Sequence, residues 1–288
     1  MEKKIVLHLG IHKTATTSLQ EFLENNRSAL RKHGASFMPL DEMRANVSPL
    51  IRSHNKTDRE TLSKLITRSG AQVDIFSDEN LMGLTSDIRV GTLYPHADGR
   101  VTRFCEQFKD LPVEVVITLR SPAKFILSSY SEYIRHHPFE DFDSYISNYP
   151  LEDFSIANEL SWVWDLPENA RVTILPFEVE NGGGVSFITN KILELACGED
   201  HDISIENFPR SKIRSVFTRE EIDLGSEIAK TVSTKAAKAF MRMIGFEELR
   251  FGEETFNPLP KSTITALEKR YVSDLKMIAS KQKKRAVI

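Results

Sequence analysis

The stretch IVLHLGIHKTATTSLQEFL, residues 5–23, decides the fold of this chain. An apolar run leads to Gly10, a short polar loop containing Lys13 follows, and the stretch ends in an amphipathic segment. This order predicts a strand, a turn and a helix. The N–H groups and the dipole of a helix N-terminus attract anions, and Lys13 adds a full positive charge. Further hydroxyl donors are Thr14, Thr16, Thr17 and Ser18. The turn is therefore predicted to hold a phosphate-like group, as in a nucleotide-binding enzyme.

Composition restricts the class of protein that can carry this loop. The chain has 288 residues, of which 40% are hydrophobic, so it can bury a full core, and we expect a single α/β domain over residues 1–288. It has no apolar run of about 18 residues, so no membrane span is expected. Its two cysteines, Cys105 and Cys197, have no metal-like spacing and favour a reduced, cytoplasmic setting. The net charge of −3 argues against bulk binding of nucleic acid.

The first third of the chain contains further predicted elements. A helix is predicted from about Thr17 to His33, because its apolar residues fall on one face. Gly34 is the residue type that usually follows a helix C-cap. Residues 41–57 are predicted to form a loop, and residues 58–69 a second helix.

The remaining predicted elements are strands at 73–76, 112–120 and 171–175 and helices at 99–109, near 218–244 and at 261–280. Ser121-Pro122 is predicted to start one more helix, with serine at the N-cap and proline at N1. Alternation of strands and helices over residues 1–200 implies a parallel sheet covered on both faces. Because ligands of such sheets bind at the carboxyl ends of strands, Gly10, Glu79 and Arg120 are expected to line one crevice.

The loop after Gly10 differs from the ATP-binding loop of P-loop proteins. That loop follows the pattern G-x-x-x-x-G-K-[ST], whose lysine contacts the β- and γ-phosphates. Counting from Gly10, Ala15 stands at the second glycine position and Thr16 at the lysine position. The only lysine of the loop, Lys13, stands three residues earlier. An early lysine among hydroxyls suits a nucleotide with a single 5′-phosphate that carries an attached group.

Two motifs resemble those of sulfotransferases that use 3′-phosphoadenosine 5′-phosphosulfate (PAPS). HLGIHKTATTSLQ, residues 8–20, is similar to the 5′-phosphosulfate loop of a bacterial subgroup with the pattern G-x-H-K-T-[GA]-T-T-S-x-Q. LRSPAKFILSSY, residues 119–130, has Arg120 and Ser128 at the spacing of the superfamily's 3′-phosphate site. Residues 75–81, IFSDENL, resemble a further segment of the subgroup more loosely. The two motifs follow in the expected order, each after its own predicted strand.

The resemblance implies a fold, a reaction and a set of site residues. It implies a P-loop NTPase-like three-layer α/β fold with a parallel sheet and a helical C-terminal third. It implies transfer of a sulfuryl group from PAPS to a hydroxyl or amine, without a metal ion, leaving adenosine 3′,5′-bisphosphate. Lys13 would lie near the bridging oxygen between phosphate and sulfate, and Arg120 and Ser128 would bind the 3′-phosphate. The implied 5′-phosphate loop comprises Lys13, Thr14, Ala15, Thr16, Thr17 and Ser18.

Three departures from the family pattern concern cofactor binding. Ser18 stands where cytosolic members carry a tryptophan near the adenine, so the adenine contact is not indicated. Ala15 replaces a usual glycine, which we expect to be tolerated unless that position requires a positive φ. The glycine-containing late basic loop of cytosolic members is absent. PRSKIR, residues 209–214, is expected to supply those contacts instead, with Arg210 as the candidate.

The identity of the catalytic base is open at this stage. Sulfuryl transfer to a hydroxyl needs a group that accepts its proton. Glu79 is favoured because it follows a strand that should end beside the phosphate loop. His12 adjoins the loop lysine and is a second candidate, and His54, Asp41 and Glu42 are further ones.

Two other functions remain open alternatives. A P-loop kinase with an atypical loop would bind magnesium–ATP, although the missing Walker lysine speaks against it. A non-catalytic nucleotide-binding protein on the same fold would bind the bisphosphate without turnover. The acceptor is not encoded in a recognisable motif, and only the resemblance suggests a saccharide, a lipid or another small molecule. The oligomeric state is not indicated.

Overall fold

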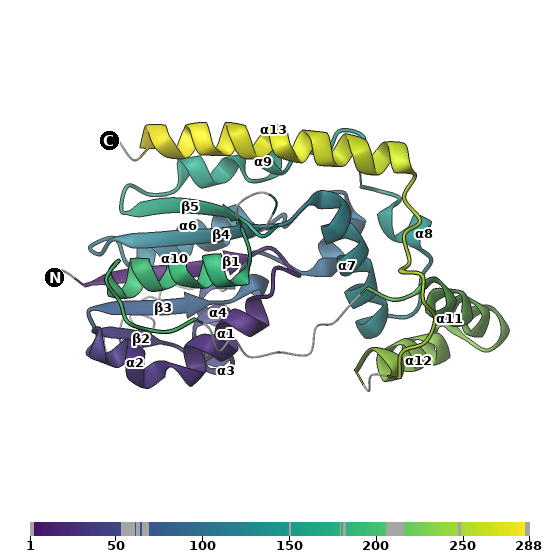
Figure 1. The fold of residues 1–288 in the computed structure, drawn as a ribbon, viewed down its shortest axis with the longest axis horizontal. Helices are drawn as coiled ribbons and strands as arrows, with labels where there is room; N and C mark the ends of the chain where they lie inside the picture. The colour runs from purple at the N-terminus through teal and green to yellow at the C-terminus, as the bar shows by residue number, and fades with distance from the viewer. Residues whose placement is uncertain are drawn as a thin grey trace.

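The computed structural model describes residues 3–52, 61, 64, 69–149, 151–178, 180, 183–205, 216–246 and 249–285. Its strands are β1 (Lys4–Gly10), β2 (Ala35–Phe37), β3 (Val73–Ser77), β4 (Val113–Leu119) and β5 (Ala170–Pro176). They form one sheet in the order β2-β3-β1-β4-β5, and every pairing is parallel (Figure 1). The predicted parallel α/β architecture is therefore confirmed.

Helices surround this sheet. The longer ones are α1 (Thr16–Asn25), α2 (Arg27–Lys32), α6 (Ala97–Gln107), α7 (Pro122–His136), α10 (Val185–Cys197), α11 (Arg219–Thr231), α12 (Thr234–Phe246) and α13 (Lys261–Arg285). The short ones are α3 (Leu40–Glu42), η1 (Met43–Val47), α4 (Ser48–Arg52), η2 (Glu79–Leu81), η3 (Thr85–Val90), α8 (Phe142–Ile146), α9 (Ile156–Glu159) and η4 (Ser161–Asp165). None of the helices in these described ranges is long and apolar enough to cross a membrane.

The alternation of side chains along the strands creates two cores, one on each face of the sheet. Ile5 and Leu7 of β1 belong to a buried cluster that continues into α6 and α7. Val6, between them, belongs to a second cluster that continues into α1 and α10. Figure 1 shows α10 and α6 on opposite sides of the strands. The result is a three-layer α/β structure, because both faces of a parallel sheet must be covered.

The C-terminal helices extend this structure. Residues of α11 and α12 join the same buried cluster as the α6 side of the sheet. Figure 1 shows α7, α11 and α12 beyond the carboxyl ends of the strands, and α13 along the β5 side. The helical C-terminal third is thus observed, whereas a single domain over residues 1–288 stays a prediction.

Three predicted elements of the first third need correction. The helix predicted from Thr17 to His33 is two helices, α1 and α2, which meet at Asn26, and the Asn26 side chain bonds back to the Phe22 carbonyl at 2.9 Å. The predicted loop at 41–57 is helical up to residue 52, and η1 within it is a π-helix. The short edge strand β2 was not predicted, because three residues carry no readable period. Residues 53–57 of the loop and most of the helix at 58–69 lie outside the described residues.

The other predicted elements agree with the structure in part. Gly34 has a φ of 73°, the left-handed conformation expected after a helix end. Ser121 and Pro122 do start α7, but the Ser121 hydroxyl donates to Glu268 of α13 instead of capping the helix. The helix predicted near 218–244 is divided into α11 and α12. α10 was missing from the predicted elements.

Candidate functional site

The loop between β1 and α1 contains two residues with left-handed backbone angles. Lys13 has a φ of 71° and Ala15 a φ of 54°, both in the left-handed region. Among the described non-glycine residues only Tyr94 shares a positive φ, so Thr14 between them lies outside that region. Left-handed residues beside right-handed ones can direct successive N–H groups into a concavity that favours an anion.

Gly10 allows the loop to fold back onto the end of β1. A Cβ at this position would stand 2.5 Å from Thr14 Oγ1 and 2.8 Å from Thr16 Oγ1, closer than side-chain atoms tolerate. Thr14 Oγ1 donates a hydrogen bond of 2.7 Å to the Ile11 carbonyl, which closes the turn. Thr16 Oγ1 is buried and has no hydrogen-bond partner in the described part of the chain. The loop therefore contains a polar atom that its own fold leaves unsatisfied.

Arg120 joins the two sequence motifs. Its Nη1 donates to the Lys13 carbonyl at 2.7 Å and to Ser128 Oγ at 3.1 Å. Its Nε is buried without a hydrogen-bond partner in the described structure. Burial lowers the pKa of the guanidinium from its usual value, and the Glu178 carboxylate partly opposes this shift. The site thus has a desolvated cation whose Nε–H is still available.

The sheet explains why these distant segments meet. β1 is flanked by β3 and β4, and Gly10 pairs in register with Thr118 near the end of β4. Because the three strands are parallel and adjacent, the residues that follow their carboxyl ends share one edge. Gly10, Glu79 and Arg120, which were predicted to line one crevice, all lie at this edge.

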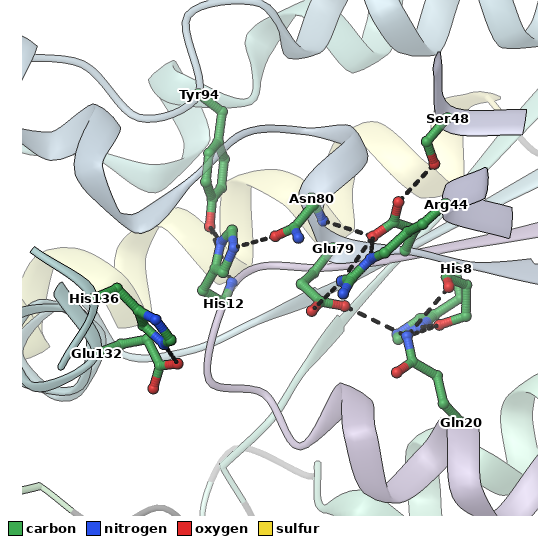
Figure 2. Close-up of polar contacts among 12 residues, drawn as sticks. His8, His12, Gln20, Arg44, Ser48, Glu79, Asn80, Tyr94, Glu132 and His136 are labelled. Atoms are coloured by element: carbon green, nitrogen blue, oxygen red, sulfur yellow. Dashed lines mark hydrogen bonds and ion pairs between the residues drawn. The ribbon is translucent and has the colours of Figure 1, made fainter. Parts of the chain in front are cut away.

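His12 is held by a network on this edge (Figure 2). Its backbone N–H donates to the Tyr94 hydroxyl at 3.0 Å, so that hydroxyl can donate in turn to His12 Nδ1 at 2.7 Å. Nε2 lies 3.0 Å from Asn80 Oδ1, which accepts its proton. Burial lowers the pKa of His12, although the Glu79 and Glu132 carboxylates oppose the shift. The contacts fit a neutral imidazole whose two nitrogens are both engaged.

Tyr94 adopts a strained backbone to make these contacts. It is buried and has a φ of 61°, which is rare for a bulky residue. Strain of this kind persists where the surrounding structure requires one geometry, and it is frequent at functional sites. It places the phenol against both the backbone and the ring of His12.

Glu79 is tied to the same edge by an arginine (Figure 2). Its Oε1 lies 3.0 Å from Arg44 Nη2, and Gln20 Nε2 lies 3.4 Å from its Oε2. Arg44 also binds the fully buried Asp78 at 3.1 Å, and Asp78 accepts from Ser48 at 2.7 Å. The π-helix η1 supplies this arginine from a region that was predicted to be a loop. The Glu79 carboxylate thus shares the Arg44 guanidinium with the buried Asp78 carboxylate.

Lys13 has a carboxylate partner on α7. Its ammonium lies 3.3 Å from Glu132 Oε2, and both side chains are 15% exposed. Figure 2 shows Glu132 together with His136, whose Nε2 lies 3.1 Å from Glu132 Oε1. The loop lysine therefore faces the helix that also carries Ser128.

The other predicted site residues differ in their placement. Thr17 is exposed and Ser18 is half-buried, both in the first turn of α1, and Ser128 is buried beside Arg120. Asp41 and Glu42 are exposed at the start of the 40–52 helical region. Arg210 and His54 lie outside the described residues.

Four residues of the site were not predicted from sequence: Arg44, Asn80, Tyr94 and Glu132. Asn80 stands in the IFSDENL segment, directly after Glu79, and that adjacency was its only signal. The other three contact partners that are far away in the chain: Arg44 is 35 positions from Glu79, Tyr94 is 82 from His12 and Glu132 is 119 from Lys13. Nothing local in the sequence marks them. In the described ranges, no group of three His, Cys, Asp or Glu side chains is arranged to hold a metal ion. The expectation of a metal-free site stays a prediction.

Comparison with known proteins adds no family assignment. No protein-family model and no curated protein matches this chain. The functional conclusion therefore rests on the motifs and on the geometry described above.

Proposed function

We propose that this protein is a sulfotransferase that moves a sulfuryl group from PAPS to a hydroxyl or amine of an acceptor. The observation that carries the proposal is the contact of Arg120 with both the Lys13 carbonyl and the Ser128 hydroxyl. It supports one nucleotide site made from the two motifs that resemble the sulfotransferase pattern. The kinship with P-loop folds is part of the same proposal.

The residues present fit an anionic nucleotide. Thr16 Oγ1 belongs to one motif and Arg120 Nε to the other, and both are buried without a hydrogen-bond partner in the described residues. A buried donor without a partner costs about 1–3 kcal/mol. Phosphate or sulfate oxygens would satisfy both atoms, since each is a hydrogen-bond donor. The left-handed conformations of Lys13 and Ala15 support the same kind of ligand.

Each residue has a proposed role in the transfer. The donor would supply a sulfuryl group bonded to a phosphate leaving group. Lys13 would stabilise the negative charge that develops on the departing phosphate oxygen, which lowers the energy of the transition state more than that of the ground state. Glu79 would accept the proton of the acceptor, oriented by Arg44. His12 would support the loop through its contacts with Tyr94 and Asn80.

The first experiment is calorimetric titration with adenosine 3′,5′-bisphosphate, beside AMP and ATP, with and without magnesium. We expect metal-independent binding that requires the 3′-phosphate, because Arg120 and Ser128 would be its partners. Preference for magnesium–ATP would contradict the proposal and favour a kinase. Binding of the bisphosphate without turnover on any acceptor would favour a non-catalytic nucleotide-binding protein.

Substitution of Arg120 tests the proposed 3′-phosphate contact directly. We expect Arg120→Ala to weaken binding of adenosine 3′,5′-bisphosphate by about 2–4 kcal/mol, because a charged partner of an anion is lost. Binding of AMP, which lacks the 3′-phosphate, should change much less and serves as the internal control. An equal loss for both nucleotides would mean that Arg120 acts only by supporting the loop.

A further inference from the structure

Glu132 of α7 is a carboxylate that contacts the loop lysine and that no motif in the sequence singled out. Its Oε2 lies 3.3 Å from the Lys13 ammonium. The same oxygen accepts a hydrogen bond of 3.1 Å from Arg135 Nη1, and Oε1 lies 3.1 Å from His136 Nε2. Three basic side chains therefore share one carboxylate at the carboxyl edge of the sheet.

Arg135 fixes the position of this carboxylate. Its side chain is fully buried, and its guanidinium carbon lies 4.5 Å from the ring centre of Phe217. Arg250 covers the same ring at 5.1 Å and binds the buried Glu221 at 2.6 Å. A side chain at Gly245 would clash with Arg135, so the glycine allows α12 to approach it. The helical C-terminal region thus anchors the partner of the loop lysine.

Ser128 and Glu132 stand four residues apart on α7, so they lie on the same face of the helix. Ser128 accepts a hydrogen bond from Arg120, and Glu132 pairs with Lys13. One helix face therefore meets both motifs. The serine contacts the arginine proposed for the 3′-phosphate, and the carboxylate contacts the lysine proposed for the sulfuryl group.

We infer that Glu132 is a positioning residue for Lys13, and that it competes with the anionic donor for the lysine's charge. This inference rests on the proposed function, in which Lys13 acts on the phosphosulfate. The Lys13–Glu132 ion pair must open or be shared before the ammonium can face the leaving oxygen. The cost of opening this ion pair reduces the net binding free energy of an anion. While the pair is closed, its geometry keeps the Lys13 ammonium directed toward α7. Removal of the carboxylate should therefore strengthen nucleotide binding and weaken catalysis.

Glu132→Gln tests this inference by calorimetric titration with adenosine 3′,5′-bisphosphate. We expect the variant to bind about five- to tenfold more tightly at low salt, because the negative charge beside Lys13 is gone while an oxygen remains for Arg135. The gain should shrink at high salt. Equal or weaker binding by the variant would overturn the inference. Failure of the unmodified protein to bind the bisphosphate would instead overturn the proposed function.

Glu140→Gln is the matched control. Glu140 also faces α7, where it accepts a hydrogen bond of 3.0 Å from the Tyr133 hydroxyl, and it pairs with Arg89 at 2.9 Å. The substitution removes the same single charge without touching the Lys13 pair. We expect the affinity for the bisphosphate to stay within about twofold of the unmodified protein. Equal tightening by both variants would mean that net charge alone acts, and would refute the specific role of Glu132.

A double-mutant cycle with Lys13→Met separates the direct effect from an indirect one. Without the ammonium, Glu132→Gln should no longer tighten binding, and persistent tightening would contradict the inference. If Glu132→Gln does not fold, Glu132→Asp replaces it, because the shorter side chain keeps the charge for Arg135 and withdraws it from Lys13. We expect a smaller gain in affinity from this variant. An unchanged affinity would count against the inference. Once an acceptor is known, Glu132→Gln should lower both kcat and the KM for the donor. Simple misfolding does not produce this combination.

Discussion

Ala15 has left-handed backbone angles, φ 54° and ψ 30°, at a position where glycine is the usual residue of the loop pattern and alanine its alternative. The sequence-based expectation was that alanine is tolerated unless a positive φ is required, and the structure requires it. An L-residue in this region clashes with its own following carbonyl, which glycine avoids. Lys13, with φ 71°, bears the same strain. Replacing it with glycine would relieve this strain but would also remove its charge. The loop therefore stores strain at two positions that flank Thr14.

Ala15→Gly should stabilise the protein, which is unusual for the introduction of glycine. We expect the free energy of unfolding to rise by about 0.5–1 kcal/mol, since relief of the left-handed strain exceeds the entropy that glycine adds to the unfolded chain. Chemical denaturation measures this difference. The matched control is Ala239→Gly, an exposed position inside α12, where the same substitution should cost about 1 kcal/mol. Destabilisation at both positions would show that Ala15 is not strained.

At the level of elements, the site depends on which strands and helices are neighbours. β1 lies between β3 and β4, so three segments separated by long stretches of chain end at one edge. α13 stabilises this edge from the β5 side. Its Tyr271 hydroxyl donates to Glu178 at 3.0 Å, and Glu178 accepts from the Ser121 N–H at 2.7 Å, next to Arg120. The C-terminal helix thus reaches the residue that follows the proposed 3′-phosphate arginine.

Tyr271→Phe tests this connection. Tyr271 and Glu178 are both buried, so loss of the hydroxyl leaves a buried carboxylate with one donor fewer. We expect the free energy of unfolding to fall by about 1–3 kcal/mol, measured by denaturant titration. Tyr149→Phe is the control, because the buried Tyr149 hydroxyl has no hydrogen-bond partner in the described structure and its removal should be neutral or stabilising. Similar decreases in the free energy of unfolding for the two variants would mean that the hydrogen bond of the Tyr271 hydroxyl does not stabilise the protein.

At the level of the whole molecule, one buried histidine connects the three central strands. His8 Nδ1 lies 2.9 Å from Ser77 Oγ of β3, and Nε2 lies 3.0 Å from Thr118 Oγ1 of β4. Burial lowers the pKa of His8 from 6.5 to about 3. The folded protein therefore holds this imidazole neutral over a pH range in which the unfolded chain protonates it. Gln20 extends the network from Ser77 to Glu79, so the sheet and the site share one set of polar contacts.

The stability of the molecule should consequently fall in acid. Above pH 6.5 His8 is neutral in both states and has no effect on the pH dependence. Below pH 6.5 the unfolded chain takes up a proton that the folded state refuses, so stability drops by up to about 1.4 kcal/mol per pH unit until the folded pKa of about 3 is reached. Denaturation curves between pH 7.5 and about pH 4.5 measure this slope. His8→Gln should show a shallower slope, because the His8 contribution is then absent while the other titrating groups, His12 among them, still act. Equal slopes would contradict the assignment.

The sequence by itself determined the four longer strands and the strand, turn and helix order at the start of the chain. Apolar runs identified β1, β3, β4 and β5, and Gly10 with Lys13 indicated the turn, because apolar runs, glycine and charge act over a few residues. Only the tertiary structure decided the left-handed φ of Ala15, the division of the first helix at Asn26 and the π-helix that supplies Arg44. It alone brought Glu132 to Lys13, which are 119 residues apart in the chain. Such contacts depend on the packing of α7 and the C-terminal helices against the sheet edge, and no local pattern carries that information.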